Sequence, residues 1–164
     1  MLKNNLKKLL IYSYIVILIF ILDRVSKLYI LNLAETNNSV DLYINSFVNL
    51  YLIWNKGIAF GIFSFEENFI YNFITILIII INFIILIMIL KTNNYKVYFL
   101  LSILGGSFGN LFDRIHYSAV PDFIDLHINN FHWFVFNVAD VFISVGVICL
   151  IFVEMFYKNN LSSK

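Results

Sequence analysis

The stretch that decides the fold is ITILIIIINFIILIMIL, residues 74–90, which contains no charged side chain. A helix needs about 20 apolar residues to cross a hydrocarbon core of about 30 Å. Extended back to residue 68, this stretch therefore predicts a membrane-spanning helix. The composition agrees, because 61% of the 164 residues are hydrophobic and only 13% are charged. A soluble domain carries about 25% charged residues, so the sequence predicts a polytopic membrane protein.

Three further apolar stretches, at residues 9–30, 95–112 and 138–157, bring the predicted number of transmembrane helices to four. We expect one mainly α-helical membrane domain over residues 1–164. The first stretch is followed by charged residues and by no A-x-A-like cleavage site, so we expect it to be retained rather than removed as a signal peptide. The single cysteine, Cys149, cannot form an internal disulfide, and we expect it to be a silent core residue.

The lysines predict the orientation of the chain. Seven of them fall at the two termini or between the second and third spans: Lys3, Lys7, Lys8, Lys91, Lys96, Lys158 and Lys164. The opposite side has at most four basic residues, so the positive-inside rule places both termini in the cytoplasm. The two longer loops, 32–67 and 113–137, would then face outward. The net charge of +1 gives no reason to expect a nucleic-acid partner.

The first outer loop has a pattern of its own. Residues 39–63 are rich in Tyr, Ile, Val and Phe, which predicts short strands turning at Asn55–Gly57. Their apolar excess suggests a small β-rich cradle lying against the outer membrane surface. Ser64 and Glu67 have the spacing of a capping box that would start the helix at residue 68.

Polar residues inside the predicted spans indicate where helices meet. Asp23 and Lys27 are four residues apart, so a helix places them on one face as an ion pair. Such a pair either marks function or is a structural pair at the interface. In the third span, Gly105 and Gly109 form a G-x-x-x-G surface for close helix packing.

A second polar face lies at the outer end of the third span. Asn110, Asp113 and Arg114 fall at positions i, i+3 and i+4, so one helix face carries all three. An Asp113–Arg114 cluster could hold helices together, and structural support is the favoured interpretation.

Two carboxylates at the outer membrane edge have both ordinary and chemical interpretations. Asn137 could cap the fourth helix with Asp140 in its first turn, and Asp122 follows a Val-Pro pair typical of turns. Together, however, two nearby and partly desolvated acids are driven to share a proton. One can then act as general base and the other as general acid, activating water against a peptide carbonyl.

Other chemistries find less support. His116, His127 and His132 all lie in the last outer loop, but their spacing matches no zinc motif, and we expect solvated or interfacial histidines. No G-x-S-x-G sequence and no phosphate-binding glycine loop is present. We therefore expect neither a metal nor a cofactor in the site.

Five sequence blocks resemble the lipoprotein signal peptidases, the type II signal peptidases of bacteria. They are DRVSK (23–27), NKGIAFG (55–61), GGSFGNLFDR (105–114), VPDF (120–123) and FNVAD (136–140). They occur in the order of that family and cover essentially the whole chain. One mild departure is Ile58, where alanine is commoner in the family.

The resemblance implies an aspartic endopeptidase that removes signal peptides from prolipoproteins, cutting before the diacylglyceryl-modified cysteine. It implies a bacterial cytoplasmic (inner) membrane location, an active site at the outer face, and lipid-modified prolipoproteins and membrane lipid as partners; we expect a monomer. By matching blocks, Asp122 and Asp140 would be the catalytic dyad. The remaining matches are site-supporting (Asn110, Asp113, Arg114, Asn137), substrate-proximal (Asn55, Gly57) and structural (Asp23, Lys27). Asp125 matches no required family position.

Two alternatives to a peptidase remain. A proton-coupled transporter also uses membrane carboxylates, but its site should lie near the midplane on interrupted helices. A non-catalytic scaffold would tolerate Asp122→Asn and Asp140→Asn equally well.

Overall fold

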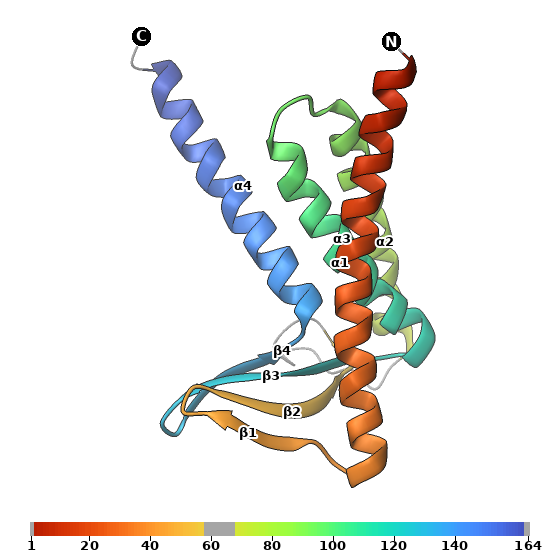
Figure 1. The fold of residues 1–164 in the computed structure, drawn as a ribbon, viewed down its shortest axis with the longest axis vertical. Coiled ribbons are helices and arrows are strands. Elements are labelled where there is room, and N and C mark those ends of the chain that lie inside the picture. The colour runs from red at the N-terminus through yellow and green to blue at the C-terminus, as the bar shows by residue number, and fades with distance from the viewer. Residues whose placement is uncertain (1, 58–67, 163–164) are drawn as a thin grey trace.

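The computed structural model describes residues 2–57 and 68–162. In chain order, the elements of this part are α1 (Leu2–Asn37), β1 (Asp41–Asn45), β2 (Val48–Asn55), α2 (Asn68–Lys91), α3 (Lys96–Tyr117), β3 (Val120–Ile128), β4 (Phe131–Phe136) and α4 (Val138–Ser162). The sheet lies at one end of the helices, and both chain termini lie at the other end (Figure 1). A mainly helical protein with a small sheet is therefore confirmed.

Three helices in the described ranges are long and apolar enough to cross a membrane. The candidate spans are Leu6–Asn37, Tyr71–Lys91 and Val138–Phe156. The third predicted span, 95–112, forms a helix, but α3 does not reach the same apolar composition. Its C-terminal half carries Asn110, Asp113 and Arg114. Because α3 packs against α1, α2 and α4, these polar groups lie among helices.

At the end near the sheet, two helices extend further than their apolar stretches predict. α1 continues to Asn37 instead of ending at residue 30, and α3 continues to Tyr117 instead of ending at residue 112. Each ends at a residue with left-handed backbone geometry, Asn38 (φ 60°) and Ser118 (φ 54°). The outer segments therefore begin later than 32 and 113, because hydropathy marks the lipid-facing length of a helix and not its hydrogen-bonded end.

The four strands form one antiparallel sheet in the order β1-β2-β3-β4. Strands are confirmed for residues 41–55. The chain reverses between β1 and β2, where the Asn45 side chain accepts hydrogen bonds from the N–H groups of Phe47 (2.9 Å) and Val48 (3.0 Å). β2 ends at Asn55, where the turn was predicted, and the chain after Gly57 lies outside the described residues. The predicted capping box, Ser64 and Glu67, and Ile58 lie outside the described residues.

The ordinary interpretation of Asp122 as a turn residue is wrong, because Val120–Ile128 is a strand. Asp122 pairs with Ile53 of β2, and Pro121 pairs with Trp54. β4 pairs with β3 only from Ile124 onward, so the start of β3 has no strand partner on that side among the described residues. A proline is tolerated at such a position, which is why the Val-Pro-Asp sequence does not end the strand.

Glycines allow the backbone of α3 to approach its neighbours, as the G-x-x-x-G spacing predicts. A Cβ atom on Gly105 would lie 2.9 Å from Ile19 Cβ, and one on Gly109 would lie 2.4 Å from Asp23 Oδ2, both on α1. A Cβ atom on Gly106 would lie 2.5 Å from the Ala139 carbonyl oxygen of α4. Close packing on both sides of α3 is therefore confirmed.

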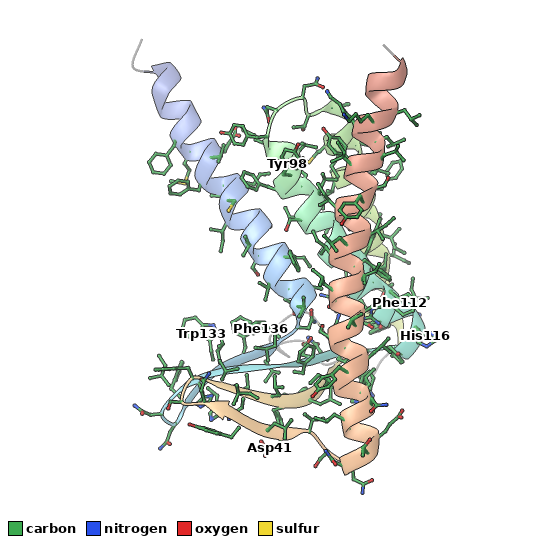
Figure 2. All side chains as sticks on the ribbon, in the orientation of Figure 1. Asp41, Tyr98, Phe112, His116, Trp133 and Phe136 are labelled. Atoms are coloured by element: carbon green, nitrogen blue, oxygen red, sulfur yellow. The ribbon has the colours of Figure 1, made fainter. Side chains whose placement is uncertain are left out.

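The outer surface of the helices is apolar, with large exposed side chains along α1, α2 and α4. Trp133 and Phe136 lie on the side of the sheet that faces α4 (Figure 2). Cys149 is partly exposed rather than part of the core. These apolar surfaces are what lipid contact requires.

Candidate active site

Asp122 lies on β3, close to where the sheet meets the helices, and is only 4% exposed. Two side-chain amides hold its carboxylate. Asn137 Nδ2 donates to Oδ1 (2.6 Å) and Asn55 Nδ2 donates to Oδ2 (2.9 Å). The Asn55 side chain is fixed in turn, because its Oδ1 accepts the N–H of Gly57 (2.9 Å). The segments that hold β2 and β3 thus meet at one carboxylate.

Asp140 lies in the first turn of α4. Its N–H donates to Asn137 Oδ1 (3.1 Å), while its own Oδ2 accepts the N–H of Asn137 (3.1 Å). This reciprocal pair is a capping arrangement, so the predicted role of Asn137 as the helix cap is confirmed. Asn110 Nδ2 donates to the remaining oxygen, Oδ1 (2.8 Å). A carboxylate at this position is also favoured by the positive end of the helix dipole.

Asn137 joins the two carboxylates. It is fully buried, its side-chain amide nitrogen is bonded to Asp122, and its backbone N–H is bonded to Asp140. A single residue therefore fixes both acids in one geometry. All four carboxylate oxygens accept an N–H hydrogen bond, and no cation bonds directly to either acid among the described residues.

Burial raises the pKa of Asp122 to about 6, and the negative charge of Asp140 contributes to the same shift. The hydrogen bonds from Asn55 and Asn137 act in the opposite direction, because they stabilise the ionised form. Desolvation is the larger effect. Asp122 can therefore gain or lose a proton near neutral pH, as an acid–base group must.

A buried ion cluster lies beside the carboxylates. We use this name for Asp23, Arg24, Lys27 and Asp113. Lys27 Nζ donates to Asp23 Oδ2 (2.9 Å) and Asp113 Oδ2 (2.7 Å), and these three side chains are fully buried. Arg24 forms ion pairs with Asp23 (3.2 Å) and Asp113 (2.6 Å). Two acids thus balance two bases between α1 and α3, and the predicted Asp23–Lys27 pair is confirmed.

Asn110 connects the ion cluster to Asp140. Its Oδ1 accepts the third hydrogen bond of Lys27 (2.8 Å), and its Nδ2 donates to Asp140. Because an ammonium group can only donate, Lys27 fixes the orientation of this amide. Asp23 makes a second connection, since its Oδ1 accepts the N–H of Ala139 at the start of α4 (3.0 Å).

Asp113 and Arg114 do not act as one cluster, although they are neighbours in sequence. Asp113 pairs with Lys27 and Arg24. Arg114 donates to the Gly57 carbonyl oxygen, and its guanidinium lies 5.5 Å from the ring centroid of Tyr71. In the described part of the chain, neither residue bonds directly to Asp122 or Asp140. Consecutive helix positions point about 100° apart, which explains why they serve different partners.

An apolar groove of about 430 Å³ reaches Asp140 between the sheet and α4. Leu126, Trp133, Phe134 and Phe136 from the strands line it together with Val141, Ser144 and Val145 of α4. Apolar walls with one carboxylate suit a ligand that is mostly apolar and has one polar group next to Asp140.

Sequence reasoning missed two features around the site. Arg24 was not predicted as a site residue, yet it completes the ion cluster. Its place next to Asp23 in the DRVSK block was the available signal. Asp125, which was left out, is buried and accepts or shares a hydrogen bond with His132 (2.8 Å). Of the histidines expected to be solvated or interfacial, His127 is largely buried and so is not solvated. His116 stacks on Phe112 with 5.4 Å between ring centroids.

The chain is similar to a known family of proteins. The family model described as signal peptidase (SPase) II matches residues 15–156. A protein of Pelagibacter ubique named lipoprotein signal peptidase is 59% identical over 157 residues, covering 96% of this chain and 95% of that protein. A protein of the same name from Anaplasma marginale is 35% identical, covering 87% of this chain and 82% of its own length.

Solved structures agree with the fold. A bacterial membrane enzyme solved by the in meso method at 2.3 Å resolution is similar with a TM-score of 0.68 and 26% identity. The match covers 93% of this chain and 91% of the other. A second such structure, at 1.9 Å resolution, gives a TM-score of 0.64 and 27% identity over 88% and 91% of the two chains.

Proposed function

Because the chain belongs to the signal peptidase II family, we propose that it is a membrane aspartic endopeptidase that removes signal peptides from prolipoproteins. The main support for an aspartic mechanism is that Asn137 donates one hydrogen bond to Asp122 and another to Asp140. Two acids fixed by one residue, with no directly bonded cation in the described chain, are suited to sharing a proton.

In the proposed reaction, a water molecule lies between the two carboxyl groups. The ionised acid takes a proton from water while the water oxygen attacks the peptide carbonyl carbon. The protonated acid donates its proton to the carbonyl oxygen, giving a neutral tetrahedral intermediate. Proton transfer to the leaving nitrogen then accompanies cleavage of the C–N bond. Asp122, with its pKa raised to about 6, supplies a group that can carry this proton close to neutral pH.

We propose that the signal helix enters the groove beside α4 and presents its cleavage point to Asp140. The apolar lining of that groove supports this placement. The diacylglyceryl chains of the lipidated cysteine would remain in the outer leaflet, next to exposed aromatic side chains of the sheet, such as Trp133. Crosslinking of lipidated substrate only to residues near the chain termini would contradict this placement.

The proposed location is the bacterial inner membrane, with α3 as a fourth spanning helix and both termini in the cytoplasm. The lysine distribution supports this orientation. Both termini lie at the end of the helices opposite the sheet (Figure 1), so an odd number of crossings between them is disfavoured. The sheet and the dyad would then face outward. We expect a monomer with membrane lipid and prolipoproteins as its partners.

A gel-shift assay with a diacylglyceryl-modified prolipoprotein tests the function. Wild-type protein should cleave the substrate, whereas Asp122→Asn and Asp140→Asn should each reduce the rate by about 1,000-fold or more. Thermal unfolding in detergent confirms that the variants are folded. Cleavage that survives either change would exclude the dyad. Absence of cleavage by wild type on verified lipidated substrate would favour the carboxylate-bearing transporter.

A further inference from the structure

A second group of titratable side chains lies in the β3–β4 hairpin. We name it the hairpin triad: Asp125, His127 and His132. Asp125 is 5% exposed and the His127 side chain 9% exposed, while the His132 side chain is 57% exposed. The triad is therefore a buried pair of side chains with one accessible member at its edge.

The strand geometry gathers these residues. Asp125 and His127 are two positions apart on β3, so their side chains share one face of the sheet. His127 and His132 are direct cross-strand partners. The rings of the two histidines stack, with centroids 5.2 Å apart and an interplanar angle of 24°. Linear spacing cannot show this meeting, since it depends on the register of the hairpin.

The backbone around the triad is fixed. Asn129, in the turn between the strands, has left-handed geometry (φ 53°), which Asn tolerates better than most residues. The N–H of His127 donates to the Phe47 carbonyl oxygen (3.0 Å), tying the hairpin to the β1–β2 turn. The three side chains of the triad thus extend from a backbone that is held in place by these contacts.

The triad is separate from the proposed catalytic dyad. The register irregularity between β3 and β4 places its extra residue on β4, and the irregularity between β2 and β3 places its extra residue on β2. β3 therefore alternates regularly. Residues three positions apart on such a strand face opposite sides, so Asp122 and Asp125 do not share a face.

Polar atoms without partners point to a missing binding partner. Asp125 Oδ2 and His132 Nδ1 are bonded at 2.8 Å. Asp125 Oδ1 and His127 Nδ1 are buried and have no hydrogen-bond partner among the described residues. The same holds for Oδ1 of Asn49, the cross-strand partner of Asp125. Buried polar groups are nearly always bonded, and a simple Asp125–His132 pair leaves these three atoms unexplained.

We propose that Asp125, His127 and His132 bind a divalent transition-metal ion, with Zn²⁺ as the ion that suits them best. The potential ligand atoms all lie within 4.8 Å of one another. Zinc–nitrogen and zinc–oxygen bonds of about 2.0–2.2 Å put neighbouring ligands of a tetrahedral site about 3.4 Å apart. The contacts of Asp125 Oδ2, 2.8 Å to His132 and 3.8 Å to His127, bracket this spacing.

The ligand chemistry selects the class of ion. Two imidazoles and one carboxylate favour Zn²⁺ and similar transition metals over Ca²⁺ and Mg²⁺, which prefer oxygen ligands. Three protein ligands leave a fourth position for water or for the amide oxygen of Asn49. Bound metal would fasten the hairpin end of the sheet, independently of any peptidase activity.

Cobalt titration of the full-length protein tests the site. The protein is purified in detergent without a polyhistidine tag and treated with a chelator, and Co²⁺ is added as a coloured substitute for Zn²⁺. We expect one Co²⁺ per chain, with visible d–d absorption that Zn²⁺ abolishes. Zn²⁺ should also raise the melting temperature, because an ion that binds only the folded state stabilises it.

Three variants make the assignment specific. His127→Gln and His132→Gln should each weaken metal binding by at least 10-fold, whereas His116→Gln, outside the triad, should bind as wild type does. His132 is more than half exposed, so its variant keeps the test valid if His127→Gln fails to fold. Absence of stoichiometric binding by wild type, or equal binding by wild type and His132→Gln, would overturn the proposal.

Discussion

Two pairs of aspartates are held in different ways. Asp23 and Asp113 are fully buried and lie against Lys27 and Arg24, so each negative charge has a cation beside it. Asp122 and Asp140 are held by amides and backbone N–H groups instead. A cation suppresses proton uptake by an acid, whereas neutral donors leave more of the desolvation cost in place. The first pair therefore lies against its own counter-charges, whereas the second pair has no directly bonded cation among the described residues.

The largest loss of stability should come from removing a cation from the ion cluster. Lys27→Met leaves Asp23 and Asp113 with only Arg24, and removal of one partner from a buried ion pair costs about 3–5 kcal/mol. Chemical denaturation in detergent measures the loss. Lys96→Met is the matched control, because Lys96 pairs with the largely exposed Glu154 and an exposed pair contributes about 1 kcal/mol or less. Equal losses in both variants would contradict a structural role for the ion cluster.

The stability contributed by Asp122 should depend on pH in the opposite direction from that of a salt-bridged acid. The pKa of Asp122 is raised from 3.8 to about 6 in the folded state, so its stabilising contribution is present below about pH 4. It is lost as pH rises through 6, by about 3 kcal/mol at most. Melting temperatures from pH 4 to 8 should show this decline in wild type, and Asp122→Asn should lack that component. Identical pH profiles would show that Asp122 has an ordinary pKa.

Asn137 offers a way to test how the proposed dyad is positioned. Asn137→Ala removes the hydrogen bond to Asp122 that favours its ionised form, so cleavage should fall by about 100-fold and the acidic limb of the pH–rate profile should move to higher pH. The profile reports the two acids together. A lower rate with an unmoved profile would indicate a structural role alone. Asn49→Ala, a change on β2 outside the dyad, is the control.

The smallest effect concerns the close contact between α1 and α3 beside the ion cluster. Gly109→Ala would place a Cβ atom 2.4 Å from Asp23 Oδ2, and the required shift of α1 from α3 should cost about 1–3 kcal/mol. Ser107→Ala, two positions away on a partly exposed site, should change the melting temperature little. Equal stability of the two variants would show that α1 moves away without cost.

Much of the helical architecture could be predicted, because apolar length and small-residue spacing are local signals. The sequence motifs also indicated Asp122, Asp140 and the asparagines that the structure brings to them. Partners across elements were harder to predict. Helical periodicity grouped Asp113 with Arg114, yet their contacts lie on different elements. The strand through Pro121 was missed because its pairing depends on where β4 begins. The hairpin triad was missed because histidine spacing carries no information on cross-strand register.

The amide of Asn110 has a consequence for newly made protein. Its orientation depends on Lys27 of α1, while the group that it holds is Asp140 of α4. No local segment contains these three residues. A chain whose helices have inserted but not yet docked therefore lacks the arrangement proposed for cleavage. The proposed activity would therefore begin only after α1, α3 and α4 have docked, so a partly folded chain would not cut neighbouring membrane proteins.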